Sequence, residues 1–145
     1  MMDGANRLIL CTLHGSRYAL RLCDVAEVME PPRIYPVPRV PQYIAGIMNF
    51  HGKLVTVLDL ANFLTGACRH PQGEVLVLDT RIANLALWVD SVEHVSSTEI
   101  IREERECAEC FVEKALMMSA GEVKMLSVDM VLDKIEEILS DISSR

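Results

Sequence analysis

The sequence predicts an all-β fold of two small, similar β-barrels in pseudo-symmetric contact, with a C-terminal helix covering an open end. Three observations predict this fold. Half of the 145 residues are hydrophobic but only 5% are aromatic, so branched aliphatic side chains, which favour strands, must build the core. Short segments with strand periodicity alternate with turn signals. The second half of the chain also resembles the first.

Two strands are expected at the start of the chain. Residues 7–13 are mostly apolar, and residues 17–22 alternate between apolar and polar side chains, which is typical of a strand with one solvated face. His14-Gly15-Ser16 between them is a turn signal. Asp24 is then expected to cap a short turn that runs through residues 25–28.

A proline-rich segment follows, with five prolines between residues 31 and 41. Proline has no backbone N–H and a fixed φ, so we expect this segment to be extended, unpaired and stiff. Residues 43–50 and 53–60 are strand-like and are separated by a turn at Gly52. One helical turn is expected after them, ended by Gly66.

The second half begins after a polar connection over residues 67–73. Residues 74–79 and 84–95 read as strands. Residues 97–110 contain five glutamates, so we expect a solvated loop or a loose helix there. A hairpin is predicted over residues 114–128.

From Asp129 onward the apolar spacing becomes that of an amphipathic helix. We predict a helix over residues 129–143, with Asp129 as its N-cap. Its apolar stripe is expected to contain Val131, Ile135, Ile138 and Ile142.

An internal duplication carries the prediction of two lobes. The segment from Leu8 to Val28 matches the segment from Val75 to Val95 in length and turn position. Gly52 likewise matches Gly121 in a second pair of hairpins. We therefore expect a first barrel at about residues 14–66 and a second at about residues 74–128, with strand 7–13 shared or flanking. The alternative is a chance likeness between unrelated hairpins.

Charge and composition exclude several classes of protein. The net charge is −7 and no cluster of Lys or Arg is present, which argues against binding to nucleic acid or to anionic membranes. No apolar run approaches the length of a membrane span, and residues 1–7 lack the features of a signal peptide. We therefore expect a cytoplasmic protein whose five cysteines are thiols.

Several motifs together resemble those of CheW-like domains. The segments RYALRLCDVAEVME and YIAGIMNFHGKLVTVLDL resemble the family signature, and LALWVDSVEHV and MLSVDMVLDKI resemble its later strands and closing helix. The matching signature positions are Ile44, Gly46, Asn49, Gly52, Asp59 and Leu60. The resemblance implies one CheW-like domain over residues 1–145, built from two five-stranded SH3-like barrels.

The resemblance also implies a function. Family members are non-enzymatic scaffolds that bind the regulatory domain of a chemotaxis histidine kinase and the helical cytoplasmic tip of chemoreceptors. No catalytic residue and no cofactor is expected. The candidate partner-binding residues are Val25, Glu27, Val28, Gly46, Asn49 and His51.

Each candidate residue has an expected role in partner binding. Val25 and Val28 are expected to line or support a groove, with Glu27 as a polar contact at its edge. Gly46 is expected to keep the strand surface flat for close approach. His51 stands where the family usually places an arginine, which weakens any contact that needs a fixed charge. A further hypothesis is therefore a chain that has kept the fold but lost coupling.

A metal- or redox-responsive domain is the competing interpretation. Cys107 and Cys110 have the spacing of two zinc ligands, and Cys68 with His70 would supply the other two. A lone C-x-x-C is weak evidence, and the acidic neighbours would raise the pKa of these thiols. We therefore favour ordinary loop cysteines and expect no bound metal.

Overall fold

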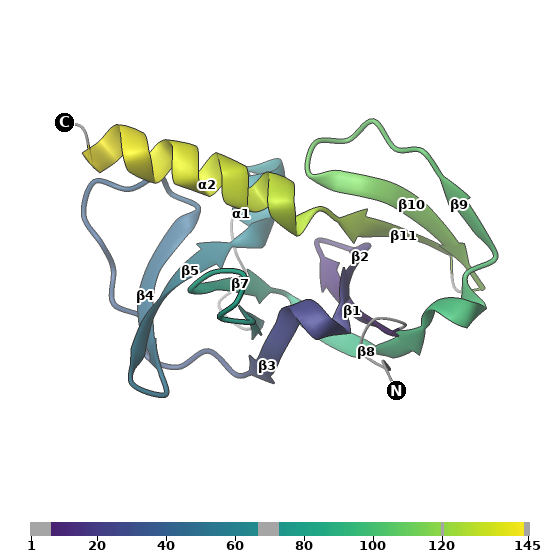
Figure 1. The fold of residues 1–145 in the computed structure, drawn as a ribbon, viewed down its shortest axis with the longest axis horizontal. Helices are drawn as coiled ribbons and strands as arrows, with labels where there is room; N and C mark the ends of the chain where they lie inside the picture. Colours follow the sequence, from purple (N-terminus) through teal and green to yellow (C-terminus); the bar gives the residue numbers. More distant parts are fainter. Residues whose placement is uncertain (1–6, 67–72, 120, 144–145) are drawn as a thin grey trace.

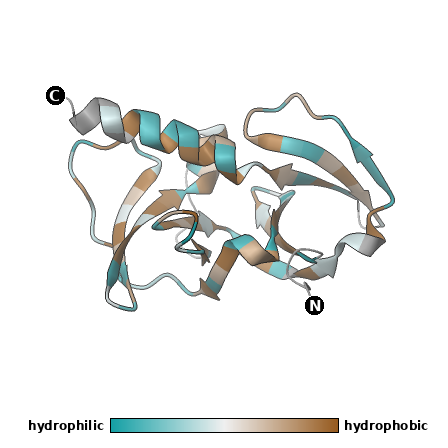
Figure 2. Ribbon diagram, in the orientation of Figure 1, coloured by the Kyte–Doolittle hydropathy of each residue, from teal (hydrophilic) through white to brown (hydrophobic). Residues whose placement is uncertain are grey.

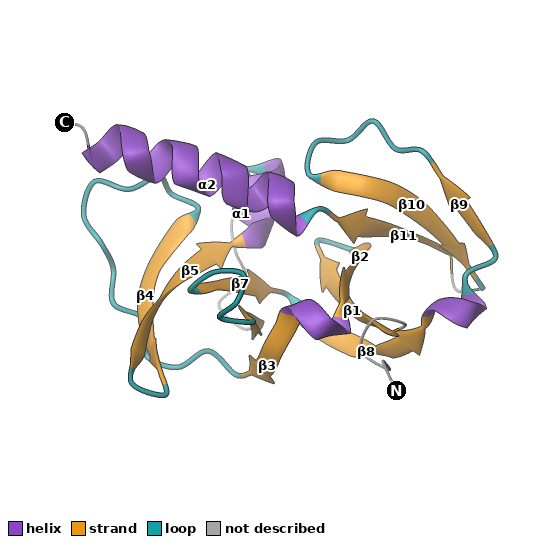
Figure 3. Ribbon diagram, in the orientation of Figure 1, coloured by secondary structure: helices purple, strands orange, loops and turns teal. Residues whose placement is uncertain are grey.

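The chain folds into two β-sheets and a C-terminal helix (Figure 1, Figure 3). The structure, a computed structural model, describes residues 7–66, 73–119 and 121–143. The six-stranded sheet contains, in spatial order, β8 (Ser91–Ser97), β1 (Arg7–Leu13), β2 (Ser16–Arg21), β11 (Gly121–Leu126), β10 (Val112–Met118) and β9 (Glu103–Arg105). The five-stranded sheet contains, in spatial order, β3 (Val25–Met29), β6 (Glu74–Leu78), β7 (Leu85–Val89), β5 (Lys53–Asp59) and β4 (Ile44–Phe50).

Each sheet takes strands from both halves of the chain. β2 lies beside β11 in one sheet, whereas β3, β4 and β5 lie with β6 and β7 in the other. This arrangement differs from the expected division into residues 14–66 and 74–128. The chain changes sheet at a 3-10 helix over Leu22–Asp24, between β2 and β3, and changes back between β7 and β8.

The duplication is visible in strand order and register. The order β8-β1-β2-β11-β10 in one sheet corresponds to β3-β6-β7-β5-β4 in the other when each strand is replaced by its repeat. Leu8 lies opposite Arg21, and their repeats Val75 and Trp88 lie opposite each other in the same way. β9 has no counterpart among the described strands, so it is an addition to the six-stranded sheet.

Both faces of the central strands are buried. Alternate residues of β1 face different cores, since Leu8 and Leu10 belong to one cluster and Ile9 and Cys11 to another. The inner core of the six-stranded sheet contains Leu8, Leu10, Ala19, Leu116, Met118, Val123 and Met125. The inner core of the five-stranded sheet contains Met48, Val55, Val57, Val75, Val77, Ala86 and Trp88. A shared core, to which both sheets and both helices contribute, joins the two lobes.

Two segments differ from their expected local structure. Asp24 ends the 3-10 helix, and residues 25–29 form strand β3 instead of the expected short turn. Hydrogen bonding to β6 decides this, because Val28 lies opposite Leu76 in an antiparallel ladder. The acidic segment 97–110 contains a second 3-10 helix, Thr98–Ile100, followed by β9.

The helices begin and end at identifiable caps. α1 (Leu60–Thr65) begins at Asp59, whose Oδ1 accepts a hydrogen bond from the Asn62 backbone N–H at 3.2 Å, and it ends at Gly66 as predicted. α2 (Val128–Ser143) begins one residue earlier than expected. Ser127, not Asp129, caps it, because Ser127 Oγ accepts a hydrogen bond from the N–H of residue 130 at 3.3 Å.

α2 packs on the shared core through its apolar stripe. Val131 and Ile135 are buried in that core and Ile138 is half-buried, as the spacing predicted; the side chain of Ile142 lies outside the described residues. Figure 2 shows hydrophobic and hydrophilic bands alternating along this helix. No helix in the described part of the chain is long and apolar enough to cross a membrane.

Candidate functional site

Two of the predicted site residues meet at the edges of the five-stranded sheet. β3 and β4 are the two edge strands of this sheet. Glu27 lies on β3 and His51 lies in the turn between β4 and β5, yet Glu27 Oε1 is 3.5 Å from His51 Nε2. The sheet therefore curls until its two edges approach each other. Both side chains are exposed, 45% for Glu27 and 75% for His51.

The turn that carries His51 is fixed by its own hydrogen bonding. His51 and Gly52 both have positive φ, 50° and 83°, which is the backbone of a type I′ two-residue hairpin. Asn49 Oδ1 accepts a hydrogen bond from the Gly52 N–H at 2.9 Å. The Phe50 ring contacts the imidazole, with ring centroids 4.3 Å apart. Asn49 thus acts on the shape of the turn, and Phe50 limits where the imidazole points.

The apolar residues of β3 pack against the shared core. Val25 and Val28 lie opposite Leu78 and Leu76 of β6. Both valines are half-buried and pack against the shared core. They therefore support β3 from the inside, while Glu27 between them is exposed.

Gly46 makes room for another part of the same chain. A Cβ atom on Gly46 would lie 2.2 Å from the carbonyl oxygen of Tyr35. Tyr35 and Ile47 exchange two backbone hydrogen bonds, each 2.8 Å long, so the proline-rich segment is paired at this point and not wholly unpaired as expected. The close approach that Gly46 permits is that of the Tyr35 backbone.

An exposed apolar face lies on the same hairpin. Leu54 is opposite Asn49, and Tyr35 is opposite Ile47, so these four residues share one face of the sheet. Leu54 is 65% exposed and Tyr35 49% exposed. The Arg33 guanidinium lies 5.1 Å from the centre of the Tyr35 ring. We call Tyr35, Ile47 and Leu54 the hairpin face.

Sequence reasoning missed the hairpin face. The signal available was the apolar residue Leu54, which lies two residues after Gly52 and next to buried Val55, so that period-two alternation turns it to the opposite face. The exposure of Tyr35 carried no such signal, because it depends on how the proline-rich segment crosses β4.

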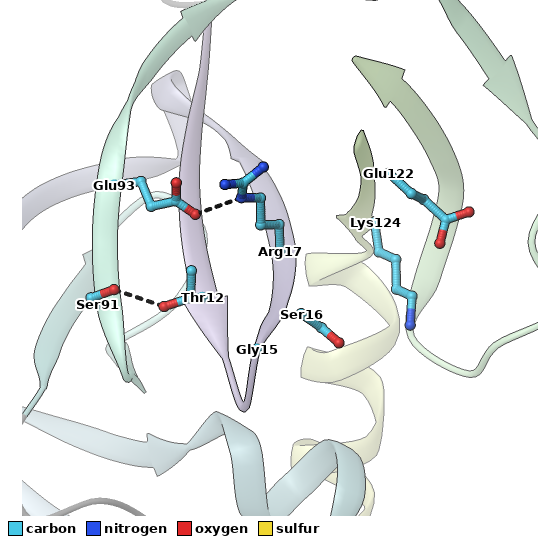
Figure 4. A pocket seen from close by; sticks show the side chains of 8 residues that line it. All are labelled: Thr12, Gly15, Ser16, Arg17, Ser91, Glu93, Glu122 and Lys124. Atoms are coloured by element: carbon cyan, nitrogen blue, oxygen red, sulfur yellow. Dashed lines mark hydrogen bonds and ion pairs between the residues drawn. The ribbon is translucent and has the colours of Figure 1, made fainter. Parts of the chain in front are cut away.

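A polar cavity lies in the other lobe, beside the six-stranded sheet (Figure 4). It has a volume of about 670 Å³ beside the turn between β1 and β2. Its lining residues are Thr12, Gly15, Ser16, Arg17, Ser91, Glu93, Glu122 and Lys124.

The two basic side chains of this cavity are paired with carboxylates of the same chain. Arg17 Nε is 2.9 Å from Glu93 Oε1, and Lys124 Nζ is 2.8 Å from Glu109 Oε1. The hydrogen bond to Glu109 raises the pKa of Lys124, so its ammonium group stays charged. Each of these two basic groups therefore already faces a carboxylate.

Only part of the alternative metal site lies among the described residues. Burial raises the pKa of Cys11 to about 12, so this thiol is a core residue. Cys107 is half-buried against the shared core and Cys110 is exposed. Cys68 and His70 lie outside the described residues. Among the residues that are described, no three His, Cys, Asp or Glu side chains are grouped as a metal site requires.

Comparisons with known proteins agree with this fold. Residues 7–109 match the family model of the CheW-like domain. Protein PilI of Pseudomonas aeruginosa is 32% identical over 81 residues, which cover 54% of this chain and 45% of that protein. The match thus spans about half the length of that relative. The scaffolding protein TtCheW from Thermoanaerobacter tengcongensis has a similar crystal structure, with a TM-score of 0.70 and 23% identity over 84% of this chain and 88% of that one.

Proposed function

The chain belongs to the CheW-like domain family, and on that premise we propose that it is a non-enzymatic adaptor that couples chemoreceptor tips to a chemotaxis histidine kinase. The metal- or redox-responsive alternative is not favoured, because the match to the CheW-like family model supports a scaffold instead. The finer parts of the proposal, namely the partners and the residues that bind them, rest on the arguments below.

One observation carries the proposal for the receptor contact. His51, which contacts Glu27 of β3, lies in the turn of the β4–β5 hairpin, and the same hairpin carries Ile47 and Leu54 of the hairpin face. Exposed apolar surface beside fixed polar groups is typical of a protein-binding site. A receptor tip is an α-helical hairpin, and an amphipathic helix binds through apolar residues flanked by polar contacts.

The kinase contact is proposed to use barrel-like lobes. In the five-stranded sheet, contact between the two edges supports closure into an SH3-like barrel. We propose one domain over residues 1–145 with two such barrels, the second extended by β9. Such a lobe can pack end to end against the like-folded regulatory domain of the kinase.

Location and chemistry follow from these proposed partners. An adaptor for the cytoplasmic tips of receptors acts in the cytoplasm. Its role is to hold two other proteins together, and the pairing of Arg17 with Glu93 and of Lys124 with Glu109 in the polar cavity is consistent with such a role.

Binding measurements with matched variants test the proposal. We expect the purified chain to bind both a receptor-tip helical hairpin and the kinase regulatory domain. Leu54→Ser and Tyr35→Ser should weaken receptor binding by about tenfold each, because each removes an exposed apolar contact. Ile100→Ser is the matched control, since Ile100 is 50% exposed but lies in the other lobe.

Two outcomes would count against the proposal. If the purified chain binds neither the receptor-tip hairpin nor the kinase regulatory domain, the adaptor proposal is wrong. Binding that Ile100→Ser weakens as much as Leu54→Ser would overturn the assignment to the hairpin face. Circular dichroism of each variant checks that the fold is kept.

A further inference from the structure

We propose that the six-stranded sheet carries a binding site for a free amino acid with an aliphatic side chain. The site is a cleft of about 260 Å³ between the sheet and the segment over residues 98–104. Ligand pockets usually have volumes of at least about 300 Å³, so this cleft suits a small molecule. In Figure 1 the segment lies at the opposite end of the molecule from β4. The site is therefore separate from the hairpin face, and the inference does not depend on the adaptor function.

One wall of the cleft is built by the part of the chain that the internal duplication does not explain. This segment, which ends in β9, contributes Thr98, Ile101 and Glu104 to the lining. The Ile101 N–H donates a hydrogen bond to the Thr98 carbonyl at 3.2 Å, and the Arg102 N–H donates one to the Met117 carbonyl of β10 at 2.8 Å. Ile101 also packs against the inner core of the sheet. The wall is therefore fixed to the sheet beside the cleft.

The base of the cleft is apolar. Leu8, Leu116 and Met125 line it, and each is at most 3% exposed within the inner core of the six-stranded sheet. Ile101 adds an apolar side chain from the wall. An aliphatic side chain that enters the cleft therefore leaves water for apolar surroundings, and each carbon that it buries should strengthen binding by about fourfold.

The charged groups of the cleft have both signs. Lys114 Nζ is 2.5 Å from Glu104 Oε1, and these side chains are 36% and 53% exposed. Arg21, which also lines the cleft, donates two hydrogen bonds of 3.1 Å to Glu113. Exposed ion pairs contribute little to stability, so a ligand can exchange for one partner of the Lys114–Glu104 pair at little cost.

A free amino acid matches this arrangement of charges. It carries a carboxylate and an ammonium group on the same carbon atom, directly beside the start of its side chain. With the aliphatic side chain in the cleft, the carboxylate can pair with Lys114 and Arg21 and the ammonium group with Glu104. An aliphatic acid would leave Glu104 without a cation, and an aliphatic amine would meet two cations of the same sign.

Titration of the unmodified chain with leucine, followed by NMR, tests the site. We expect saturable shifts of the Leu8, Ile101 and Leu116 amide resonances. Alanine should bind at least about tenfold more weakly, because its side chain has three fewer carbons to bury. Isocaproate, which lacks the ammonium group of leucine, and isoamylamine, which lacks its carboxylate, should each bind about twofold to fivefold more weakly than leucine.

Variants at two neighbouring residues of β9 isolate the charge recognition. Glu104→Gln should weaken leucine binding by about twofold to fivefold and should not weaken the binding of isocaproate. Glu103→Gln is the matched control, since alternation along the strand turns Glu103 to the opposite face, where it pairs with Arg105 at 3.0 Å. This variant should bind leucine as the unmodified chain does. Lys114→Met should weaken the binding of leucine and of isocaproate.

Three results would overturn the proposal. The first is the absence of saturable shifts at leucine concentrations well above the millimolar range. The second is equal binding of leucine, isocaproate and isoamylamine, because the cleft would then recognise an apolar group alone, such as a side chain of a partner protein. The third is a loss of leucine binding in Glu103→Gln as large as that in Glu104→Gln. Circular dichroism checks that each variant keeps the fold.

Discussion

Ala19 and Ala86 occupy the same position in the two sheets. Ala19 lies opposite Leu10 on one side and Met125 on the other. Ala86 lies opposite Val77 on one side and Val57 on the other. In both sheets the first neighbour is antiparallel and the second is parallel, and both alanines are completely buried. Each alanine faces the inner core of its own sheet.

The two alanines should tolerate little increase in size. We expect Ala19→Leu and Ala86→Leu each to lower the free energy of unfolding by about 1–3 kcal/mol, because extra methylene groups in a packed core force strain. Ala26→Leu on β3 is the control, since Ala26 is exposed, and its effect should stay within about 0.5 kcal/mol. Chemical denaturation measures all three. An Ala86→Leu variant as stable as the unmodified chain would contradict the packing of the inner core.

The second prediction concerns Gly46 and the proline-rich segment. Gly46→Ala should displace Tyr35 from β4, because the added methyl group would meet the Tyr35 carbonyl oxygen. In the unmodified chain, the Tyr35 and Ile47 amides each donate a hydrogen bond to the carbonyl group of the other residue. We expect both amides to lose their protection from hydrogen exchange in the variant. The variant should also be less stable.

Gly52→Ala is the matched control for this effect. Gly52 has a φ of +83°, but a Cβ there meets nothing within 4 Å. This variant should lose stability through backbone strain alone and keep the protection of Tyr35 and Ile47. Equal loss of protection in both variants would refute the role assigned to Gly46.

The sequence predicts local structure well because local structure depends on neighbours in the chain. The period of two in β1 and β2, and the His-Gly turn between them, are enough to define that hairpin. The repeat then predicts the second copy. Which sheet a strand joins is not local, since Tyr18 pairs with Lys124, more than 100 positions away. The exchange of strands between the two halves therefore has no signature in the sequence pattern.

The candidate site shows the same division. Glu27 and His51 could each be identified as candidate binding residues from family motifs. Their contact arises only because the sheet curls and brings β3 to the β4–β5 turn. Gly46 could be chosen as a glycine that permits close approach, and the group that lies against it in the structure is the Tyr35 backbone. Leu54 was missed because residue type alone does not report exposure.

The third prediction concerns the ion pair between Arg21 and Glu113. The guanidinium donates two hydrogen bonds of 3.1 Å to the two carboxylate oxygens. These bonds hold the pKa of Glu113 below its usual value. A lowered pKa in the folded state gives stability that is complete above the ordinary carboxyl value of about 4.3 and is lost as the pH falls through the folded-state value.

A double-mutant cycle with Arg21→Met and Glu113→Gln measures this interaction. At neutral pH we expect an interaction free energy of about 0.2–1 kcal/mol, small because both side chains are partly exposed. At about pH 2, well below the ordinary carboxyl value, it should approach zero, because Glu113 is then protonated. An interaction that is equally strong in acid would show that packing, not charge, links the two residues.

The last prediction concerns Cys11, whose reactivity should depend on unfolding. The thiolate is the form that reacts with alkylating reagents. Burial, reinforced by the nearby carboxylates Glu93 and Asp90, raises the pKa of Cys11 to about 12. Iodoacetamide at about pH 8, near the ordinary thiol value, should therefore label exposed Cys23 and Cys110 well before Cys11. Labelling sites are identified by mass spectrometry of peptides. In denaturant Cys11 should label as fast as the other two, because its environment is then aqueous. Rapid labelling of Cys11 in the folded protein would place this residue outside the shared core. It would also contradict the alternation of β1 side chains between two cores.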